Sequence, residues 1–261
     1  MYERLDVCPS CKHTHFLNHI ICKDHAASGE SFAIVKCTKC DLLFTNPRPN
    51  QSNISKYYEH ADYISHTNNA NNPINLLYKL ARRYTLSQKI SLITKFTPNK
   101  YLLDYGCGTG IFTNYAKSRG YIVDAVEPSP DARRIADDIL GITVKSNVVK
   151  IKPKSYDIIT AWHVIEHVHE LRITLNTLRK SLRDNGIIFI AVPNCLSYEA
   201  IKYQENWAAY DVPRHLYHFT QSSFKTLAHN CKLHLVETVP MKLDAFYVSM
   251  LSEKYLNRGN S

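Results

Sequence analysis

Long hydrophobic runs are absent from this sequence. The longest apolar run, IIFIAV at residues 187–192, is far shorter than the roughly 20 apolar residues that cross a bilayer as a helix. The amino terminus, MYERLDVC, has mixed charges and no apolar segment, so it does not have the pattern of a secretion signal. These absences predict a cytosolic (cytoplasmic) protein without membrane insertion.

Clustered basic charge is also missing, although the formal net charge is +9 and the pI is about 9.1. Lysine and arginine are scattered along the chain, and the longest basic cluster lies within ARR at residues 81–83. Nucleic-acid partners usually go with a basic stripe on one face. Charge alone therefore does not predict such a partner.

Glycine is scarce, with eight residues among 261, yet three of them alternate in LLDYGCGTG at residues 102–110. Glycine is used where the backbone takes a conformation closed to other residues, or where a group approaches it closely. The stretch follows an apolar run and opens a segment of helical type. Ligands of doubly wound sheets bind at such a strand-to-helix crossover. The pattern therefore predicts a ligand site at this loop.

Short apolar runs alternate with segments of helical type beyond residue 100. The expected strands are YLLDYG, IVDAVEP, YDIITAW and GIIFIAVPN, with a further strand HLVETVP at 234–240. The expected helices are residues 111–120, 129–139, 170–186 and 222–231, with one or two more in 73–96. This alternation predicts an α/β fold with a doubly wound, mostly parallel sheet covered on both faces.

The eight cysteines favour a metal site over disulfides in a cytosolic chain. Cys8 with Cys11, and Cys37 with Cys40, form two Cys-x-x-Cys pairs. Two such pairs have the pattern of a tetrahedral four-thiolate zinc site. A redox pair or a chance pairing is the alternative, but a redox motif needs one copy only. The sequence predicts a structural Zn²⁺ that holds together a small segment.

Glu127 ends the second strand of the α/β region, in VDAVEPS. A carboxylate at this position can accept hydrogen bonds from both hydroxyls of a ribose. The alternative role is to cap the following helix.

These motifs together resemble the class I S-adenosylmethionine-dependent methyltransferases. LLDYGCGTG resembles their first motif, VDAVEPS their acidic second strand, and YDIITAWHVIEHV a fourth-strand motif of small-molecule and quinone-precursor enzymes. LRDNGIIFIAVPN is similar to the turn and fifth strand, although Asp184-Asn185-Gly186 replaces Pro-Gly-Gly. The resemblance covers roughly residues 85–240. Some sugar methyltransferases are also similar at both ends, with a cysteine-knuckle module first.

The resemblance implies a Rossmann-like methyltransferase domain at residues 85–261, after a zinc-ribbon-like module at 1–46 and a linker or helical arm at 47–84. It implies that S-adenosyl-L-methionine binds at the following residues: Asp104, Gly106, Cys107, Gly108, Gly110, Glu127, Pro128, Asn147, Ala161, Trp162 and His163. In these roles the glycines lie against the methionine part, Glu127 holds the ribose and Pro128 lines the adenine pocket. Asn147 stands where the family often has an acid.

Methyl transfer needs a held nucleophile and a dry site, and a general base only where the acceptor is not already ionised. The candidate catalytic side chains are His163, His215, Tyr217 and His218, with His167 as a further candidate base. Arg214 is expected to receive an anionic acceptor. We expect the polar arm at 51–72 and the segment 197–220 to close over the methyl group.

The sequence favours a small-molecule acceptor, methylated at carbon or oxygen. A ribosomal or transfer RNA base methyltransferase with a zinc-ribbon module is the first alternative. A non-catalytic zinc-ribbon docking protein is the second. AWHV is unlike the motif of adenine-amine methylation, and Cys195 follows the fifth strand rather than the fourth, which argues against cytosine methylation. Glu166 and His167 are candidate ligands for a divalent ion, because some related quinone-precursor enzymes bind one.

Overall fold

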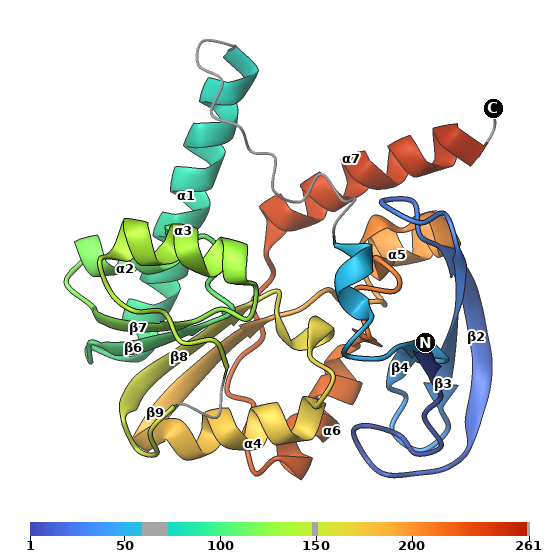
Figure 1. The fold of residues 1–261 in the computed structure, drawn as a ribbon, viewed down its shortest axis with the longest axis horizontal. Coiled ribbons are helices and arrows are strands. Elements are labelled where there is room, and N and C mark those ends of the chain that lie inside the picture. The colour runs from blue at the N-terminus through green and yellow to red at the C-terminus, as the bar shows by residue number, and fades with distance from the viewer. Residues whose placement is uncertain (59–72, 148–150, 260–261) are drawn as a thin grey trace. The chain divides into compact units, whose positions relative to one another are not determined.

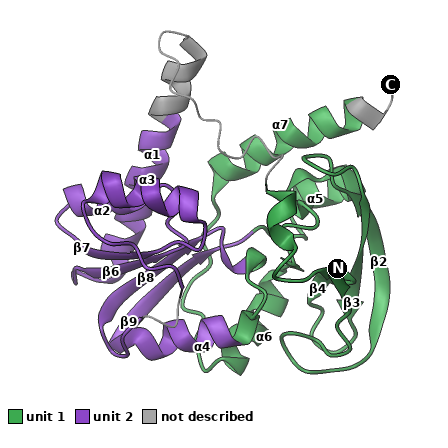
Figure 2. Ribbon diagram, in the orientation of Figure 1, with its two compact units in different colours: residues 1–68, 166–172, 193–261 green, residues 69–165, 173–192 purple. Residues whose placement is uncertain are grey.

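The computed structural model describes residues 1–58, 73–147 and 151–259, which form two compact units (Figures 1 and 2). One unit lies within residues 1–68, 166–172 and 193–261, and the other within residues 69–165 and 173–192. The expected domains at 1–46, 47–84 and 85–261 group the residues differently, because 193–261 go with the amino-terminal residues. The domain limits stay a prediction.

The second unit is built on a parallel sheet with the strand order β7-β6-β8-β9. Its strands are β6 (Tyr101–Tyr105), β7 (Ile122–Val126), β8 (Tyr156–Trp162) and β9 (Leu182–Ala191). The four principal strand predictions beyond residue 100 are confirmed, and β9 begins earlier than expected. The predicted α/β class with a mostly parallel sheet is therefore confirmed.

Helices cover the strands of this sheet, which explains why most residues of the strands are apolar. They are α1 (Pro73–Phe96), α2 (Ile111–Ser118), α3 (Pro130–Leu140) and α4 (Leu171–Ser181). In Figure 1, α2 and α3 lie on one face of the sheet and α4 on the other. Ile93 of α1 and Ala116 of α2 share one buried cluster with Leu102 and Ile158. This packing fixes the strand ends that carry the glycine loop.

The first unit contains an antiparallel sheet with the order β10-β4-β3-β2, and a separate pair of β1 with β5. The strands are β1 (Tyr2–Glu3), β2 (Phe16–Lys23), β3 (Ser31–Cys37), β4 (Leu43–Thr45), β5 (Arg48–Pro49) and β10 (Tyr217–His218). The helices are α5 (Tyr198–Tyr203), α6 (Gln221–Asn230) and α7 (Lys242–Gly259), and short 3-10 helices lie at Ile54–Tyr57, Ile165–His167, Gln204–Asn206 and Ala208–Tyr210. The amino-terminal strands thus share a sheet with residues far along the chain.

The strand predicted at 234–240 is wrong: the segment is irregular, and Leu235 and Val236 are 43% and 72% exposed. An apolar alternation forms a strand only where a partner strand accepts its hydrogen bonds, and no described strand pairs with it. Residues 59–72 of the predicted lid lie outside the described residues.

No helix in the described ranges is long and apolar enough to span a membrane.

Candidate functional site

The glycine loop follows β6 and precedes α2. Gly106 has φ +75°, and its N–H donates to the carbonyl oxygen of Val126 over 2.8 Å. A Cβ added to Gly106 would lie 2.7 Å from Cγ1 of Val164, closer than real side chains come. Gly106 is therefore required by packing against Val164, whereas the sequence had suggested a ligand as the reason.

Gly108 is the glycine of this loop that faces open space. It has φ +55°, and a Cβ added there would have no heavy atom within 4 Å. Gly110, in contrast, would bring a Cβ within 3.3 Å of Ala136 and Leu140 of α3. A ligand can therefore approach the backbone of the loop at Gly108.

The Glu127 carboxylate connects this loop to the end of β7. Its Oε2 accepts a hydrogen bond from the N–H of Gly108 over 2.9 Å, and Oε1 accepts one from the N–H of Ser129 over 2.8 Å. The side chain of Ser129, and not that of Glu127, caps α3. A carboxylate has about four lone-pair sites, so Glu127 retains capacity for two ribose hydroxyls.

Asp104 is turned into the protein. It is 2% exposed and accepts hydrogen bonds from the hydroxyls of Thr113 on α2 and Thr160 on β8. Burial raises the pKa of this carboxyl, and the two threonine hydrogen bonds lower it in part. Asp104 thus joins three elements beneath the loop. Sequence reasoning missed both threonines, because single hydroxyls within a strand and a helix give no pattern.

The carboxyl end of β8 supplies the next predicted residues. Ala161 is buried, and the Nε1 atom of Trp162 is buried with no hydrogen-bond partner among the described residues. His163 has φ +58°, which is uncommon for a residue other than glycine, and its N–H donates to Ala191 over 3.0 Å. An unpaired donor at this edge suits a ligand with acceptor oxygens.

The remaining predicted cofactor residues surround the same strand ends. Burial raises the pKa of the Cys107 thiol, which keeps it neutral. Lys145 pairs with β7, since its carbonyl oxygen accepts from the N–H of Glu127 over 2.9 Å. Asn147 lies two residues after Lys145 in the sequence. Asn147 and Pro128 are both exposed. Their predicted contacts with a cofactor stay predictions.

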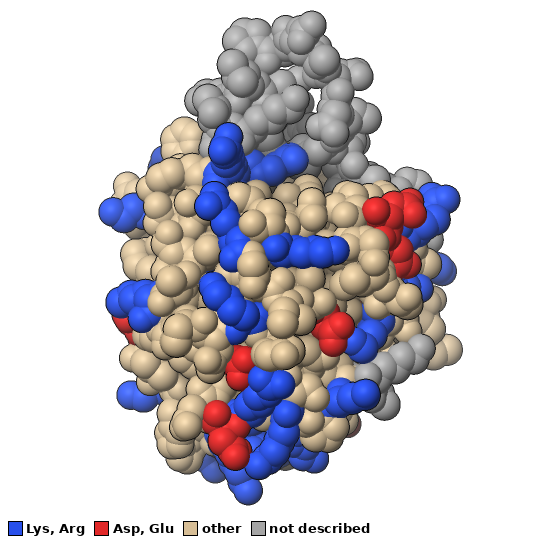
Figure 3. Space-filling model, turned by 90° about the vertical axis from the view of Figure 1, so that its left-hand side faces the viewer, with Lys and Arg blue, Asp and Glu red and all other residues tan. Residues whose placement is uncertain are grey.

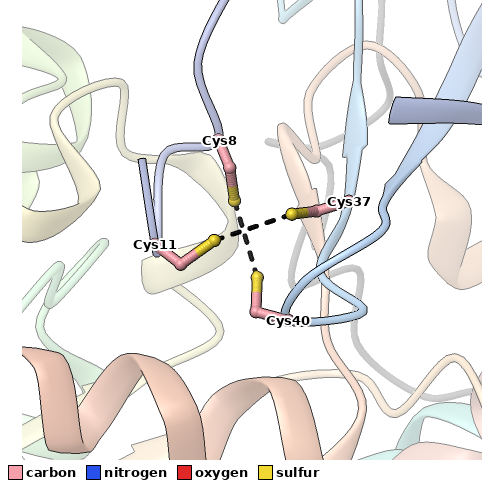
Figure 4. Close-up of side chains that lie close together, drawn as sticks. All are labelled: Cys8, Cys11, Cys37 and Cys40. Atoms are coloured by element: carbon pink, nitrogen blue, oxygen red, sulfur yellow. Dashed lines mark hydrogen bonds between the residues drawn. The ribbon is translucent and has the colours of Figure 1, made fainter. Parts of the chain in front are cut away.

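The four predicted metal ligands come together in the first unit (Figure 4). Their sulfur atoms all lie within 4.8 Å of one another, and the distances are 3.6 Å between Cys8 and Cys40 and 3.6 Å between Cys11 and Cys37. Sulfurs at about 2.3 Å from one tetrahedral ion are about 3.8 Å apart. The donor set and its spacing fit a zinc ion.

The histidines and tyrosine of the RHLYH segment make contacts within the first unit. Nδ1 of His215 donates to the carbonyl oxygen of Ala209 over 2.8 Å. The Tyr217 hydroxyl donates to the carbonyl oxygen of His169 and accepts from Arg48. Nε2 of the buried His218 lies 3.2 Å from Oγ1 of Thr45. All three side chains therefore have protein partners, and their catalytic roles stay predictions.

Arg214 does not offer its guanidinium to an acceptor. It is 1% exposed and donates to both Asp24 and Asp211 and to the carbonyl oxygen of Tyr57. These contacts connect the turn after β2 with the segment before β10. The expectation that Arg214 receives an anionic acceptor is replaced by a structural ion pair, because two carboxylates already occupy its donors.

Glu166, His167 and His215 form a second group of candidate ligands in the first unit, with their donor atoms within 4.8 Å of one another. Nδ1 of His167 lies 3.0 Å from the Tyr58 hydroxyl and 3.0 Å from the carbonyl oxygen of Arg214. Burial lowers the pKa of His167 to about 4, so its ring is neutral near pH 7. His215 was not expected beside the Glu166–His167 pair.

Comparison with protein families gives a match over more than half of the chain. The family model described as methyltransferase domain matches residues 78–238. Among solved structures, the putative sarcosine dimethylglycine methyltransferase of Galdieria sulphuraria has a TM-score of 0.50 at 15% identity, covering 69% of this chain and 81% of that one. At this identity the likeness shows the fold alone.

Curated relatives match over shorter stretches. The ubiquinone biosynthesis O-methyltransferase of Haemophilus ducreyi is 24% identical over 157 residues, which are 55% of this chain and 64% of that protein. The enzyme of the same name from Glaesserella parasuis is 27% identical, with coverages of 47% and 55%. The chain thus spans less than two thirds of the length of these relatives.

Proposed function

Because the chain belongs to the methyltransferase domain family, we propose that it transfers the methyl group of S-adenosylmethionine to a small-molecule acceptor. The relatives named as ubiquinone biosynthesis O-methyltransferases support a hydroxyl oxygen as the methylated atom. The observation that carries the proposal is the loop at Gly108, which is open to a ligand and hydrogen-bonded to the Glu127 carboxylate.

The residues present fit this cofactor. Glu127 would hold the ribose, the backbone at Gly108 would lie against the methionine part, and Trp162 would border it. The bound cofactor supplies a sulfonium methyl that is already electrophilic. What this chain must supply is the position of the acceptor and a water-free site.

We assign the base, where the acceptor needs one, to His163, His215, Tyr217 or His218. His163 is the member that follows the same strand end as Trp162, and its unusual φ supports a functional role. His163→Asn should lower turnover while leaving the affinity for S-adenosylhomocysteine unchanged. The matched variant His218→Asn tests a second of the four candidates. Turnover that survives both substitutions would exclude His163 and His218 as the base.

The four-cysteine cluster is proposed to hold one structural zinc ion. The support is the donor set itself: four thiol sulfurs grouped at near-tetrahedral spacing. Zinc ties together segments that are too small to bury a core alone. In this chain it would connect Cys37 and Cys40, at and after the end of β3, with Cys8 and Cys11 in the loop between β1 and β2.

Calorimetric titration with S-adenosylhomocysteine tests the cofactor, and transfer of a labelled methyl group tests the acceptor. We expect binding with one site per chain, and label in low-molecular-weight acceptors that carry a hydroxyl group. Absence of S-adenosylhomocysteine binding would overturn the proposal at its first step.

An RNA acceptor is the second candidate, because the chain is basic and Lys and Arg side chains outnumber Asp and Glu side chains on the face drawn in Figure 3. The labelling experiment decides between the two when ribosomal and transfer RNA are included as acceptors. Label in RNA alone would replace the small-molecule proposal. Cofactor binding without transfer to any acceptor would favour the non-catalytic docking protein.

A further inference from the structure

Basic residues that are scattered along the sequence meet at one edge of the parallel sheet. Because β6, β7, β8 and β9 are parallel, their amino ends lie at the same edge, opposite to the glycine loop. The following residues stand directly before or at these four strand starts and are called the amino-edge cluster: Lys100, Lys117, Arg119, Lys154, Lys180 and Arg183. The first five are exposed, and the side chain of Arg183 is 39% exposed.

Contacts between the strand starts connect the members of the cluster. The first N–H of β7 donates to the carbonyl oxygen of Lys100 over 2.9 Å. The N–H of Lys154, before β8, donates to the carbonyl oxygen of Lys180, before β9, over 3.0 Å. The guanidinium carbon of Arg183 lies 4.3 Å from the centroid of the Tyr101 ring, at the start of β6. The six residues therefore lie along one continuous edge.

The net charge of the chain belongs to the unit that contains this sheet (purple in Figure 2). Residues 69–165 and 173–192 hold 17 lysines and arginines against 8 aspartates and glutamates, a net charge of +9 that equals the value for the whole chain. Asp157 pairs with Arg183 at 3.2 Å, and Asp184 with Lys154 at 3.0 Å. Among the described residues, no carboxylate forms an ion pair with the other four members. The amino edge is thus a positively charged surface.

Helix ends explain only part of this charge. A cation near the carboxyl end of a helix interacts favourably with the helix dipole, and Lys117 and Lys180 stand in the last turns of α2 and α4. Lys117 also donates to the carbonyl oxygen of Leu140, the last residue of α3, over 2.7 Å. Lys100 and Lys154 lie outside the helices, so helix dipoles do not account for them. A surface that gathers such charges attracts a partner of opposite charge.

We propose that the amino edge of the sheet binds the phosphate backbone of a nucleic acid. Arginine, lysine and tyrosine side chains are among those that contact phosphate oxygens, and this edge combines all three. The guanidinium carbon of Arg119 lies 5.0 Å from the ring centroid of Tyr115. Arg183 lies over Tyr101, which is 44% exposed. A lipid surface is instead recognised by basic residues beside the apolar face of one helix, whereas this cluster lies at strand starts and helix ends.

The nucleic acid is a docking partner here and not the methyl acceptor. β6 has five residues, so its amino end lies about 16 Å from the glycine loop at its carboxyl end, at about 3.3 Å per residue. A backbone bound at the amino edge does not reach Gly108. The inference therefore goes beyond the proposed function and does not depend on it.

Fluorescence anisotropy with the full chain and a short fluorescein-labelled RNA duplex tests this surface. We expect a Kd of about 10⁻⁶–10⁻⁴ M at about 150 mM salt, the range for sequence-independent binding. With about five phosphate contacts, the binding constant should fall about 500-fold between about 50 and 200 mM salt. A DNA duplex should bind similarly, because the contacts are to the backbone. Absence of binding, or binding that salt does not weaken, would overturn the inference.

A triple variant of the cluster combines Lys100→Gln, Lys154→Gln and Lys180→Gln. The slope of log K against log salt concentration should become shallower by about three, because three phosphate contacts are lost. Affinity for the duplex should fall by about tenfold or more. Thermal unfolding checks that the variant keeps the wild-type fold.

The matched control removes three exposed lysines of the other unit, Lys56→Gln, Lys225→Gln and Lys254→Gln. It lowers the net charge equally, and its affinity should stay within about threefold of the wild type, because salt screens distant charges. An equal loss in both triple variants would contradict the proposed surface, since net charge alone would then explain binding.

Two further ligands separate this surface from other sites. Binding to vesicles of phosphatidylglycerol but to neither duplex would replace the nucleic acid by a lipid surface. Calorimetry with S-adenosylhomocysteine should give the wild-type affinity in both triple variants. A wild type that binds the duplex but not S-adenosylhomocysteine would overturn the proposed function and support the amino edge as a separate site.

Discussion

Among single residues, Glu127 has the most direct connection between geometry and ligand. Its carboxylate holds the backbone of Gly108 and retains free lone pairs at the end of β7. Glu127→Ala should weaken binding of S-adenosylhomocysteine by about 1.5–3 kcal/mol, the range for hydrogen bonds to a charged group. Titration calorimetry measures this loss. Glu127→Gln, which keeps one acceptor oxygen, should lose less, and an unchanged affinity in the alanine variant would contradict the ribose assignment.

Two glycines of one loop should respond differently to the same substitution. Gly106→Ala adds a methyl group against Val164 at positive φ, so we expect a loss of about 2–4 kcal/mol in the free energy of unfolding from strain and overpacking. Gly108→Ala also has positive φ but meets no atom, and should cost about 1–2 kcal/mol. Its main effect should be on cofactor affinity. Denaturant unfolding combined with calorimetry separates the two, and equal stability of both variants would contradict this assignment.

At the scale of elements, β4 and β10 connect the cysteine cluster to the histidine-bearing segment. β4 begins three residues after Cys40 and pairs with β10, with Tyr217 opposite Phe44 and His218 opposite Leu43. Thr45 adds a hydrogen bond from its hydroxyl to the carbonyl oxygen of His215 over 2.9 Å. The four-cysteine cluster and residues 215–218 are therefore connected through one antiparallel sheet.

Replacement of one of the four cysteines should change both the zinc content and the stability of the protein. Cys37→Ser should reduce the zinc content of the purified protein from one ion per chain to none, and should lower its unfolding midpoint, because metal binding contributes to folding. Cys22→Ala is the control: Cys22 lies between the knuckles in sequence but outside the cluster, so zinc content should stay at one. Elemental analysis measures both, and a wild type without zinc would contradict the site.

The elements also show what a single sequence can and cannot predict. The parallel strands were predictable because burial on both faces makes most of their residues apolar. The position of Glu127 directly after β7 was predictable because it follows such a run, and its role toward a cofactor stays a prediction. β10 was not, since a strand of two residues has no period and its partner β4 lies far away in sequence. The packing of Val164 on Gly106 could not be predicted for the same reason, because the two residues are far apart in sequence. The strand expected at 234–240 shows the opposite error, an apolar pattern without a partner.

For the whole molecule, two histidines with lowered pKa values predict that acid destabilises the folded state. Burial lowers the pKa of His167 to about 4 and that of His218 well below its usual value. The unfolded chain takes up these protons near pH 6.5 and the folded chain does not. The contribution of these two histidines to the free energy of unfolding is therefore fully present above about pH 6.5. It is lost progressively as the pH falls toward 4.

Chemical denaturation at a series of pH values measures this effect. Each histidine should contribute a slope of up to about 1.4 kcal/mol per pH unit between pH 6.5 and 4. His218→Gln should flatten the slope, whereas His234→Gln, at an exposed position, should leave it unchanged. Stability that is constant across this window would contradict the prediction.

The pairing of β4 with β10 also bears on how the chain is made. The contact of Thr45 with His215 spans 170 residues, and that of Asp24 with Arg214 spans 190. At about 5–20 residues per second, synthesis of the intervening chain takes roughly 10–35 s. During this time the amino-terminal strands leave the ribosome without their last partner strand, and Asp24 without its arginine. The amino-terminal sheet therefore begins to form early and is completed late, and until β10 is synthesised the edge of β4 lacks the strand that covers it.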